Sequence, residues 1–177
     1  MLSFLANERE IDLREDYKQN EGHQIAILTI SDTRTEESDK GGTLVWQLAE
    51  ESGVKIVEKV ICKDDELAIR QALAHWFKMP EVDAIITTGG TGIAKRDCSI
   101  EAIQPLFTKE MTGFGELFRY VSYTEYIGTK AMLSRAVAGV AHDKMIFVLP
   151  GSTGAVRLAM TKLILPELNH IVRELKK

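Results

Sequence analysis

Residues 82–92, VDAIITTGGTG, decide the fold of this chain, because an apolar run leads directly into a cluster of glycines. The run over 82–88 is nearly continuous and predicts a strand that is buried on both faces, as in parallel sheets. Glycines directly after such a strand let backbone N–H groups approach an anion closely. The stretch therefore predicts an α/β fold with a binding loop at the carboxyl edge of its sheet.

Strand patterns and helix patterns alternate on both sides of this stretch. The predicted strands cover residues 24–30, 54–61, 82–88, 134–141 and 145–149, and the alternation of apolar and polar residues puts 54–61 nearer to an edge. The predicted helices cover residues 43–52, 65–78, 99–107 and 113–126, and a last helix follows the turn at 150–152. Pro166 lacks an N–H and is expected to break or kink that last helix.

The short connection over 142–144 predicts a hairpin between the last two strands, so one strand of the sheet should run antiparallel. The whole pattern is typical of an α/β domain with a mostly parallel sheet. The length of 177 residues fits one domain, and we expect a polar N-terminal arm over 1–22 followed by a single domain over 23–177.

The composition excludes several classes of protein. Hydrophobic residues make up 45% of the chain and charged residues 27%, as in ordinary globular proteins. The formal net charge of −4 argues against a protein that binds nucleic acid mainly through phosphate contacts. No apolar run reaches the ~18 residues that a membrane helix needs, so we expect no membrane partner.

The N-terminus and the cysteines predict a cytoplasmic protein. The first 22 residues are rich in acidic side chains, unlike a signal peptide or a transit peptide. The two cysteines, Cys62 and Cys98, are too few for a disulfide framework and have no metal-ligand spacing around them. Cys98 is interpreted as a small buried residue, because no histidine lies nearby in the sequence to activate its thiol.

Three polar turns follow predicted strands and can converge at one edge of the sheet. They are SDTR at 31–34, TTGGTG at 87–92 and PGSTG at 150–154. Their backbone N–H groups predict a phosphate-binding site, with tight turns that merely need glycine as the alternative. Neither G-x-G-x-x-G nor a P-loop is present. The candidate binding residues in the last two turns are Thr88, Gly89, Gly90, Thr91, Gly92, Pro150, Gly151 and Ser152.

Carboxylates beside these turns are candidate ligands for Mg2+. Asp97 lies five residues past Gly92, and Asp64 and Asp65 open a predicted helix. Two carboxylates next to a phosphate site can hold Mg2+, which prefers oxygen ligands. Capping of the helix is the alternative for Asp64 and Asp65, and Asp97 is alternatively a solvated loop acid. The candidate cations for neutralising phosphate are Lys95, Arg96, Arg135 and Arg157.

Five blocks together carry a resemblance to a known family. They are TTGGTG at 87–92, Arg96-Asp97, GFGE at 113–116, SRA at 134–136 and PGS at 150–152. In this order and spacing they resemble the MoaB/Mog family of molybdenum cofactor biosynthesis proteins, closest to the MoaB branch, over about residues 24–172. The resemblance implies a three-layer α/β/α domain. It also implies Mg-ATP-dependent adenylylation of molybdopterin with release of pyrophosphate.

The resemblance also assigns residues and partners. Asp97 and Asp65 match the two essential aspartates of the family, which take part in catalysis and bind Mg2+. Because Asp64 directly precedes Asp65, the alignment of the second aspartate stays open by one residue. Ser134 and Arg135 match residues that line the pterin end of the site, and Glu116 is either a helix-start acid or a further binding residue. Family members form trimers or hexamers and pass their product to a MoeA-like molybdate-insertion protein.

Three other functions are compatible with the same residues. The first is a non-catalytic molybdopterin-binding or carrier protein of the same pathway. The second is an enzyme that acts on another nucleotide. The third is a scaffold for the next enzyme, although a scaffold would not need the acids and glycines that this chain contains.

Overall fold

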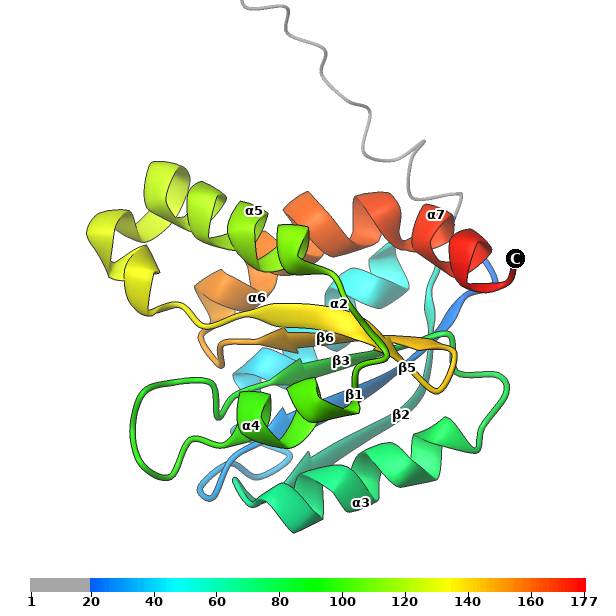
Figure 1. The fold of residues 1–177 in the computed structure, drawn as a ribbon, viewed down its shortest axis with the longest axis horizontal. Coiled ribbons are helices and arrows are strands. Elements are labelled where there is room, and N and C mark those ends of the chain that lie inside the picture. The colour runs from blue at the N-terminus through cyan, green and yellow to red at the C-terminus, as the bar shows by residue number, and fades with distance from the viewer. Residues whose placement is uncertain (1–19) are drawn as a thin grey trace, which may run out of the picture.

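A six-stranded sheet lies between two layers of helices in the computed structural model, which describes residues 20–177 (Figure 1). Strands β2, β1, β3 and β6 pair in parallel, whereas β5 pairs antiparallel with both β6 and β4. β5 is therefore the one reversed strand of this sheet, and the expected three-layer α/β fold is confirmed. In the spatial order of the sheet, the strands are β2 (Lys55–Cys62), β1 (Gln24–Ile30), β3 (Ala84–Thr88), β6 (Lys144–Leu149), β5 (Val137–Ala141) and β4 (Lys109–Glu110).

Helices cover both faces of the sheet. The upper face in Figure 1 is covered by α2 (Lys40–Glu51), α5 (Thr112–Ser122), α6 (Thr153–Ala159) and α7 (Leu165–Leu175). The lower face is covered by α3 (Glu66–Phe77) and α4 (Ser99–Ile103). The shorter helical segments are η1 (Gln104–Leu106), η2 (Tyr123–Ile127), η3 (Gly128–Leu133) and η4 (Met160–Ile164).

The side chains of the central strands alternate between two apolar cores. In β1, Ile25 and Ile27 pack into the core under α2, whereas Ala26 and Leu28 pack into the core under α3. Burying one large aliphatic side chain contributes ~1.5–3 kcal/mol, so burial on both faces stabilises these strands strongly. It also explains why 24–30 reads as a nearly continuous apolar run.

The first helix starts three residues earlier than the sequence predicts, at Lys40. Asp39 caps it, because its Oδ1 accepts a hydrogen bond from the N–H of Gly42 at 2.9 Å. A Cβ on Gly42 would lie 2.4 Å from Oγ1 of Thr29, so this glycine permits a close approach between α2 and β1. Gly41 and Gly42 thus belong to the packed first turn of the helix.

Three predicted helices change geometry along their length. The helix predicted over 99–107 is α4 followed by the 3-10 turn η1. The helix predicted over 113–126 is α5 followed by the π-helical turn η2. Pro166 does not end the last helix, and it occupies the first turn of α7 directly after the π-helical turn η4. The expected break is therefore a change of helix type.

The hairpin between β5 and β6 is confirmed, with a tighter turn than predicted. Its turn consists of His142 and Asp143, which have φ of 50° and 59°, and Lys144 already belongs to β6. Two residues with positive φ match the right-handed twist of a hairpin. The strand predicted from residue 134 begins only at Val137, which leaves Ser134 and Arg135 in a connecting segment.

The expected N-terminal arm lies largely outside the described residues. Of its last residues, Asn20 is buried and donates from its side chain to the carbonyl of Leu165 at 2.8 Å. Within 20–177, none of the helices combines the length and the hydrophobicity that crossing a bilayer requires.

Candidate functional site

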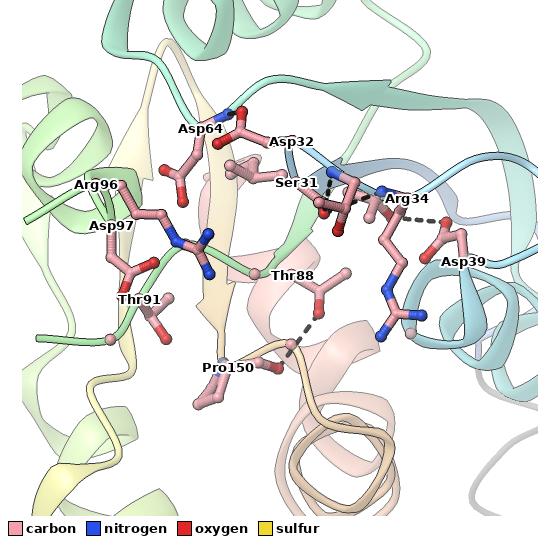
Figure 2. A pocket seen from close by; sticks show the side chains of 18 of the residues that line it. Ser31, Asp32, Arg34, Asp39, Asp64, Thr88, Thr91, Arg96, Asp97 and Pro150 are labelled. Atoms are coloured by element: carbon pink, nitrogen blue, oxygen red, sulfur yellow. Dashed lines mark hydrogen bonds between the residues drawn. The ribbon is translucent and has the colours of Figure 1, made fainter. Parts of the chain in front are cut away.

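A cavity of about 480 Å3 opens where the parallel strands β1, β2, β3 and β6 end (Figure 2). The cavity thus lies at the edge of the sheet that the three polar turns predict. Its size is within the range of small-molecule sites. Its lining residues are Thr29, Ile30, Ser31, Asp32, Thr33, Arg34, Asp39, Gly41, Asp64, Thr88, Gly89, Gly90, Thr91, Gly92, Arg96, Asp97, Leu133, Ser134, Pro150 and Gly151.

The glycine loop is fixed against the ends of two strands. The N–H of Gly89 donates to the carbonyl of Leu149 at 3.0 Å, and Oγ of Ser99 donates to the carbonyl of Gly89 at 2.7 Å. A Cβ on Gly89 would lie 2.3 Å from the carbonyl oxygen of Ile30, and its φ is +99°. Only glycine fits this position, so the backbone lies against the end of β1 with no side chain between them.

Asp97 and Arg96 lie toward one end of the cavity (Figure 2). Oδ2 of Asp97 accepts a hydrogen bond from the N–H of Ala94 at 3.2 Å, which closes the loop that follows Gly92. A Cβ on Gly92 would lie 2.5 Å from the same oxygen, so this carboxylate lies directly against the glycine loop. Asp97 and Arg96, both predicted site residues, thus lie beside the glycine loop that they follow in the sequence.

Of the two acids that open the predicted helix, Asp64 lines the cavity, together with Asp32, Asp39 and Asp97. Asp65 is the N-cap of α3, where its Oδ1 accepts from the N–H of Ala68 at 2.9 Å, and it does not line the cavity. The backbone of Asp65 is extended, with φ −143° and ψ 130°, and successive side chains of extended backbone point in opposite directions. One residue therefore caps the helix while the preceding residue faces the cavity.

Asp64 is held by hydrogen bonds on both its main chain and its carboxylate. Its N–H donates to Oδ1 of Asp32 at 3.2 Å. Its Oδ1 accepts from the N–H of Cys98 at 3.1 Å and from the thiol of Cys98 at 3.3 Å. The pKa of the Cys98 thiol is raised to about 12, mainly by burial and next by its hydrogen bond to Asp64. The pKa of Cys62 is raised to about 11, mainly by burial and next by the negative charge of Asp64. Cys98, predicted as a small buried residue, is only partly buried, and no pattern in the sequence indicates its contact with Asp64.

A buried ion pair forms the other end of the cavity. The carboxylate of Asp39, which is 2% exposed, lies 3.1 Å from Nζ of Lys59 and accepts from Oγ1 of Thr29 at 2.8 Å. Arg34 also lines the cavity and donates to the carbonyl of Ser38 at 3.0 Å. Neither Asp39 nor Lys59 was a predicted site residue, and the only signal for Asp39 is its position before a helix.

Besides Asp65 and the candidate cations Lys95 and Arg157, three predicted binding residues do not line the cavity. Ser152 caps α6 by accepting from the N–H of Ala155 at 3.2 Å. Arg135 donates from Nη1 to the carbonyl of Gly92 at 3.2 Å and pairs through Nη2 with Glu101 on α4. Glu116 lines a separate cavity of about 250 Å3 beside α5. The remaining predicted binding residues, Thr88, Gly89, Gly90, Thr91, Gly92, Ser134, Pro150 and Gly151, line the main cavity.

The donor set of the cavity is compatible with a cation bound jointly by protein and substrate. Within residues 20–177, no three His, Cys, Asp or Glu side chains converge to form a metal cage. Mg2+ is usually held by one or two carboxylates together with substrate phosphates and water. Asp64 and Asp97 supply two carboxylates in the same cavity as the glycine loop.

The fold and the cavity define the class of α/β proteins whose ligand site lies at the carboxyl edge of a parallel sheet. Residues 26–170 match the family described as "Probable molybdopterin binding domain". The chain belongs to this family of molybdenum cofactor biosynthesis proteins, so the predicted resemblance is confirmed.

Similar proteins agree with this placement. Molybdenum cofactor biosynthesis protein B of Staphylococcus carnosus is 59% identical over 156 residues, which cover 87% of this chain and 91% of the relative. A crystal structure of a molybdenum cofactor biosynthesis protein B has a TM-score of 0.86 at 54% identity, over 89% of this chain and 98% of that chain. The tungsten cofactor synthesizing protein MoaB from Pyrococcus furiosus has a TM-score of 0.77 at 36% identity, over 88% and 98%.

Proposed function

We propose that this protein adenylylates molybdopterin at the cavity described above, with Mg-ATP as the donor and pyrophosphate as the leaving group. The observation that carries the proposal is the position of Asp64 and Asp97 beside a rigid glycine loop in one cavity. Such an arrangement suits phosphoryl-group chemistry, in which positioning and charge neutralisation supply most of the catalysis.

The reaction needs no strong general base. The nucleophile is an oxygen of the terminal phosphate of molybdopterin, which is already an anion at neutral pH. It forms a bond to the α-phosphorus of ATP while the bond from that phosphorus to the pyrophosphate oxygen breaks. Backbone N–H groups of the glycine loop would hold phosphate oxygens, and the guanidinium of Arg96 would neutralise charge on the triphosphate.

Asp64 and Asp97 would hold Mg2+ in this proposal. The cation would draw charge from the triphosphate and so assist departure of pyrophosphate. Asp64 takes the role that the sequence assigned to Asp65, because Asp64 is the acid of that pair that lines the cavity.

The experiment that tests this proposal is pyrophosphate release from ATP and Mg2+ with freshly prepared molybdopterin. The chain offers a matched pair of variants, because Asp64→Asn changes the cavity while Asp65→Asn changes only the cap of α3. Asparagine caps helices about as well as aspartate, so Asp65→Asn should fold and turn over normally. We expect Asp64→Asn and Asp97→Asn to lose at least 100-fold in turnover. Normal turnover in Asp64→Asn, with loss in Asp65→Asn, would return the role to Asp65.

A non-catalytic carrier of molybdopterin is the alternative function, because the polar cavity would also serve binding alone. A carrier would bind molybdopterin and release no pyrophosphate from ATP. Binding without release in the wild-type protein would therefore favour the carrier and reject the transferase.

The proposal includes assembly into a homo-oligomer, with a trimer and a hexamer as the expected forms. Four large side chains on α5 and η2 are 54–66% exposed: Leu117, Tyr120, Tyr123 and Tyr126. Tyrosine combines a large apolar area with a polar tip and is enriched at protein interfaces. Light scattering should report a trimer or hexamer that dissociates in Tyr120→Glu, and a monomeric wild type would reject this part. Transfer of the product to a MoeA-like protein in the cytoplasm stays a prediction.

A further inference from the structure

On the basis of the role proposed for Asp64, we infer that Cys98 is a positioning residue that fixes the orientation of the Asp64 carboxylate. The N–H and the thiol of Cys98 both donate to Oδ1 of Asp64, at 3.1 Å and 3.3 Å. No residue within 20–177 donates a hydrogen bond to Oδ2 of Asp64. One oxygen of the carboxylate is thus bound to the protein while the other is available to a ligand.

Gly90 confines the same carboxylate from another direction. A Cβ on Gly90 would lie 2.7 Å and 2.8 Å from the two carboxylate oxygens of Asp64. The φ of Gly90 is +62°, so the backbone also favours glycine here. The carboxylate therefore lies close to the main chain of Gly90 while it accepts hydrogen bonds from Cys98.

A neutral donor suits this position for an electrostatic reason. A lysine or arginine at 98 would also orient the carboxylate, but its charge would cancel the negative charge that attracts a cation. A thiol is a weak donor, and hydrogen bonds to a charged acceptor are stronger than neutral ones. Cys98 thus supplies orientation and leaves the charge of Asp64 in place.

The geometry is tested by infrared spectroscopy of the S–H stretch in the full-length protein. The band of Cys98 is identified by its loss in Cys98→Ala, and Cys62→Ala removes the other thiol. A thiol that donates to a carboxylate absorbs at lower frequency than a free thiol. We expect the Cys98 band to move to higher frequency in Asp64→Asn, because an amide oxygen is a weaker acceptor. A band that stays in place in Asp64→Asn would overturn the inference.

The positioning role is tested by kinetics in a second set of measurements. Cys98→Ala removes the side-chain donor, and we expect kcat to fall about three- to tenfold with little change in the KM for molybdopterin. Cys98→Ser keeps a donor and should restore most of kcat, whereas Cys62→Ala should retain wild-type turnover. Equal kcat in Cys98→Ala and wild type would overturn the role. If the wild-type protein releases no pyrophosphate, the proposed function fails, and the position of the Cys98 band alone then decides the inference.

Discussion

Replacing Gly89 by alanine tests the claim that the glycine loop lies directly against the end of β1. The new Cβ would lie 2.3 Å from the carbonyl oxygen of Ile30, the last residue of β1, and the main chain of Gly89 is itself bound to Leu149 of β6. An ordinary contact is at least 3.4 Å, so the loop has to move by about 1 Å. Such a move also weakens the hydrogen bonds of Gly89 with Leu149 and Ser99.

The chain contains a matched control for the backbone conformation. Gly22 has a φ of +93°, close to the +99° of Gly89, and a Cβ there would meet nothing within 4 Å. Both alanine variants therefore share the strain of a positive φ, which is about 1–2 kcal/mol. Only Gly89→Ala adds an overpacking cost of ~1–3 kcal/mol and weakened hydrogen bonds of ~1 kcal/mol.

Urea denaturation and turnover together measure this difference. We expect Gly89→Ala to lose about 3–6 kcal/mol of unfolding free energy and Gly22→Ala about 1–2 kcal/mol. A displacement of 1 Å at a catalytic loop costs about 100-fold in rate, so turnover should fall in Gly89→Ala alone. Equal losses in the two variants would refute the close approach of the loop to β1.

Three further predictions concern other contacts of the cavity. Asp39→Ala leaves Lys59 without its buried partner and should cost about 3–5 kcal/mol of unfolding free energy. Glu36→Ala removes the exposed partner of the same lysine and should cost less than about 1 kcal/mol. Similar costs of the two variants in denaturation curves would contradict the burial of the Asp39–Lys59 pair. Arg135→Ala removes the hydrogen bond to the carbonyl of Gly92 and should lower turnover about tenfold. Glu101→Gln keeps that hydrogen bond and should lower turnover less. A larger loss of turnover in Glu101→Gln than in Arg135→Ala would show that the ion pair with Glu101 matters more than the hydrogen bond to Gly92. The pKa of Cys98 is about 12 instead of 9.0, which lowers the fraction of thiolate at pH 8 about a thousandfold. Iodoacetamide should therefore label Cys98 slowly in the native protein and rapidly in urea, and the native labelling rate should still rise above pH 9. Rapid labelling of the native protein at pH 8 would show that the pKa is not raised.

The strands and the location of the site could be predicted because they depend on local pattern. The apolar runs over 24–30 and 82–88 are read directly from sequence, since burial on both faces leaves few polar residues in them. Glycines after a strand then give the edge at which a ligand binds, and the cavity lies there. Helix boundaries depended on packing instead, as at Gly42, which packs against Thr29 from another element.

The direction of individual side chains could not be predicted. Asp64 and Asp65 are chemically equivalent in the sequence, and only the backbone dihedrals at the start of α3 decide which of them faces the cavity. Arg135 follows Ser134 directly, yet Ser134 lines the cavity while Arg135 holds the carbonyl of Gly92. The pair of Asp39 and Lys59 joins residues 20 positions apart, which no local pattern reveals.

Transfer of label from ATP to molybdopterin tests the central claim most directly. Wild-type protein would be incubated with Mg2+, molybdopterin and ATP that carries radioactive phosphorus at either the α or the γ position, and the pterin would be separated by chromatography. Adenylylation predicts that only α-labelled ATP transfers label to the pterin and that the γ-label is released in pyrophosphate. The Asp64→Asn variant should show neither labelled pterin nor labelled pyrophosphate. Label from γ-labelled ATP on the pterin, or no label from either, would contradict it.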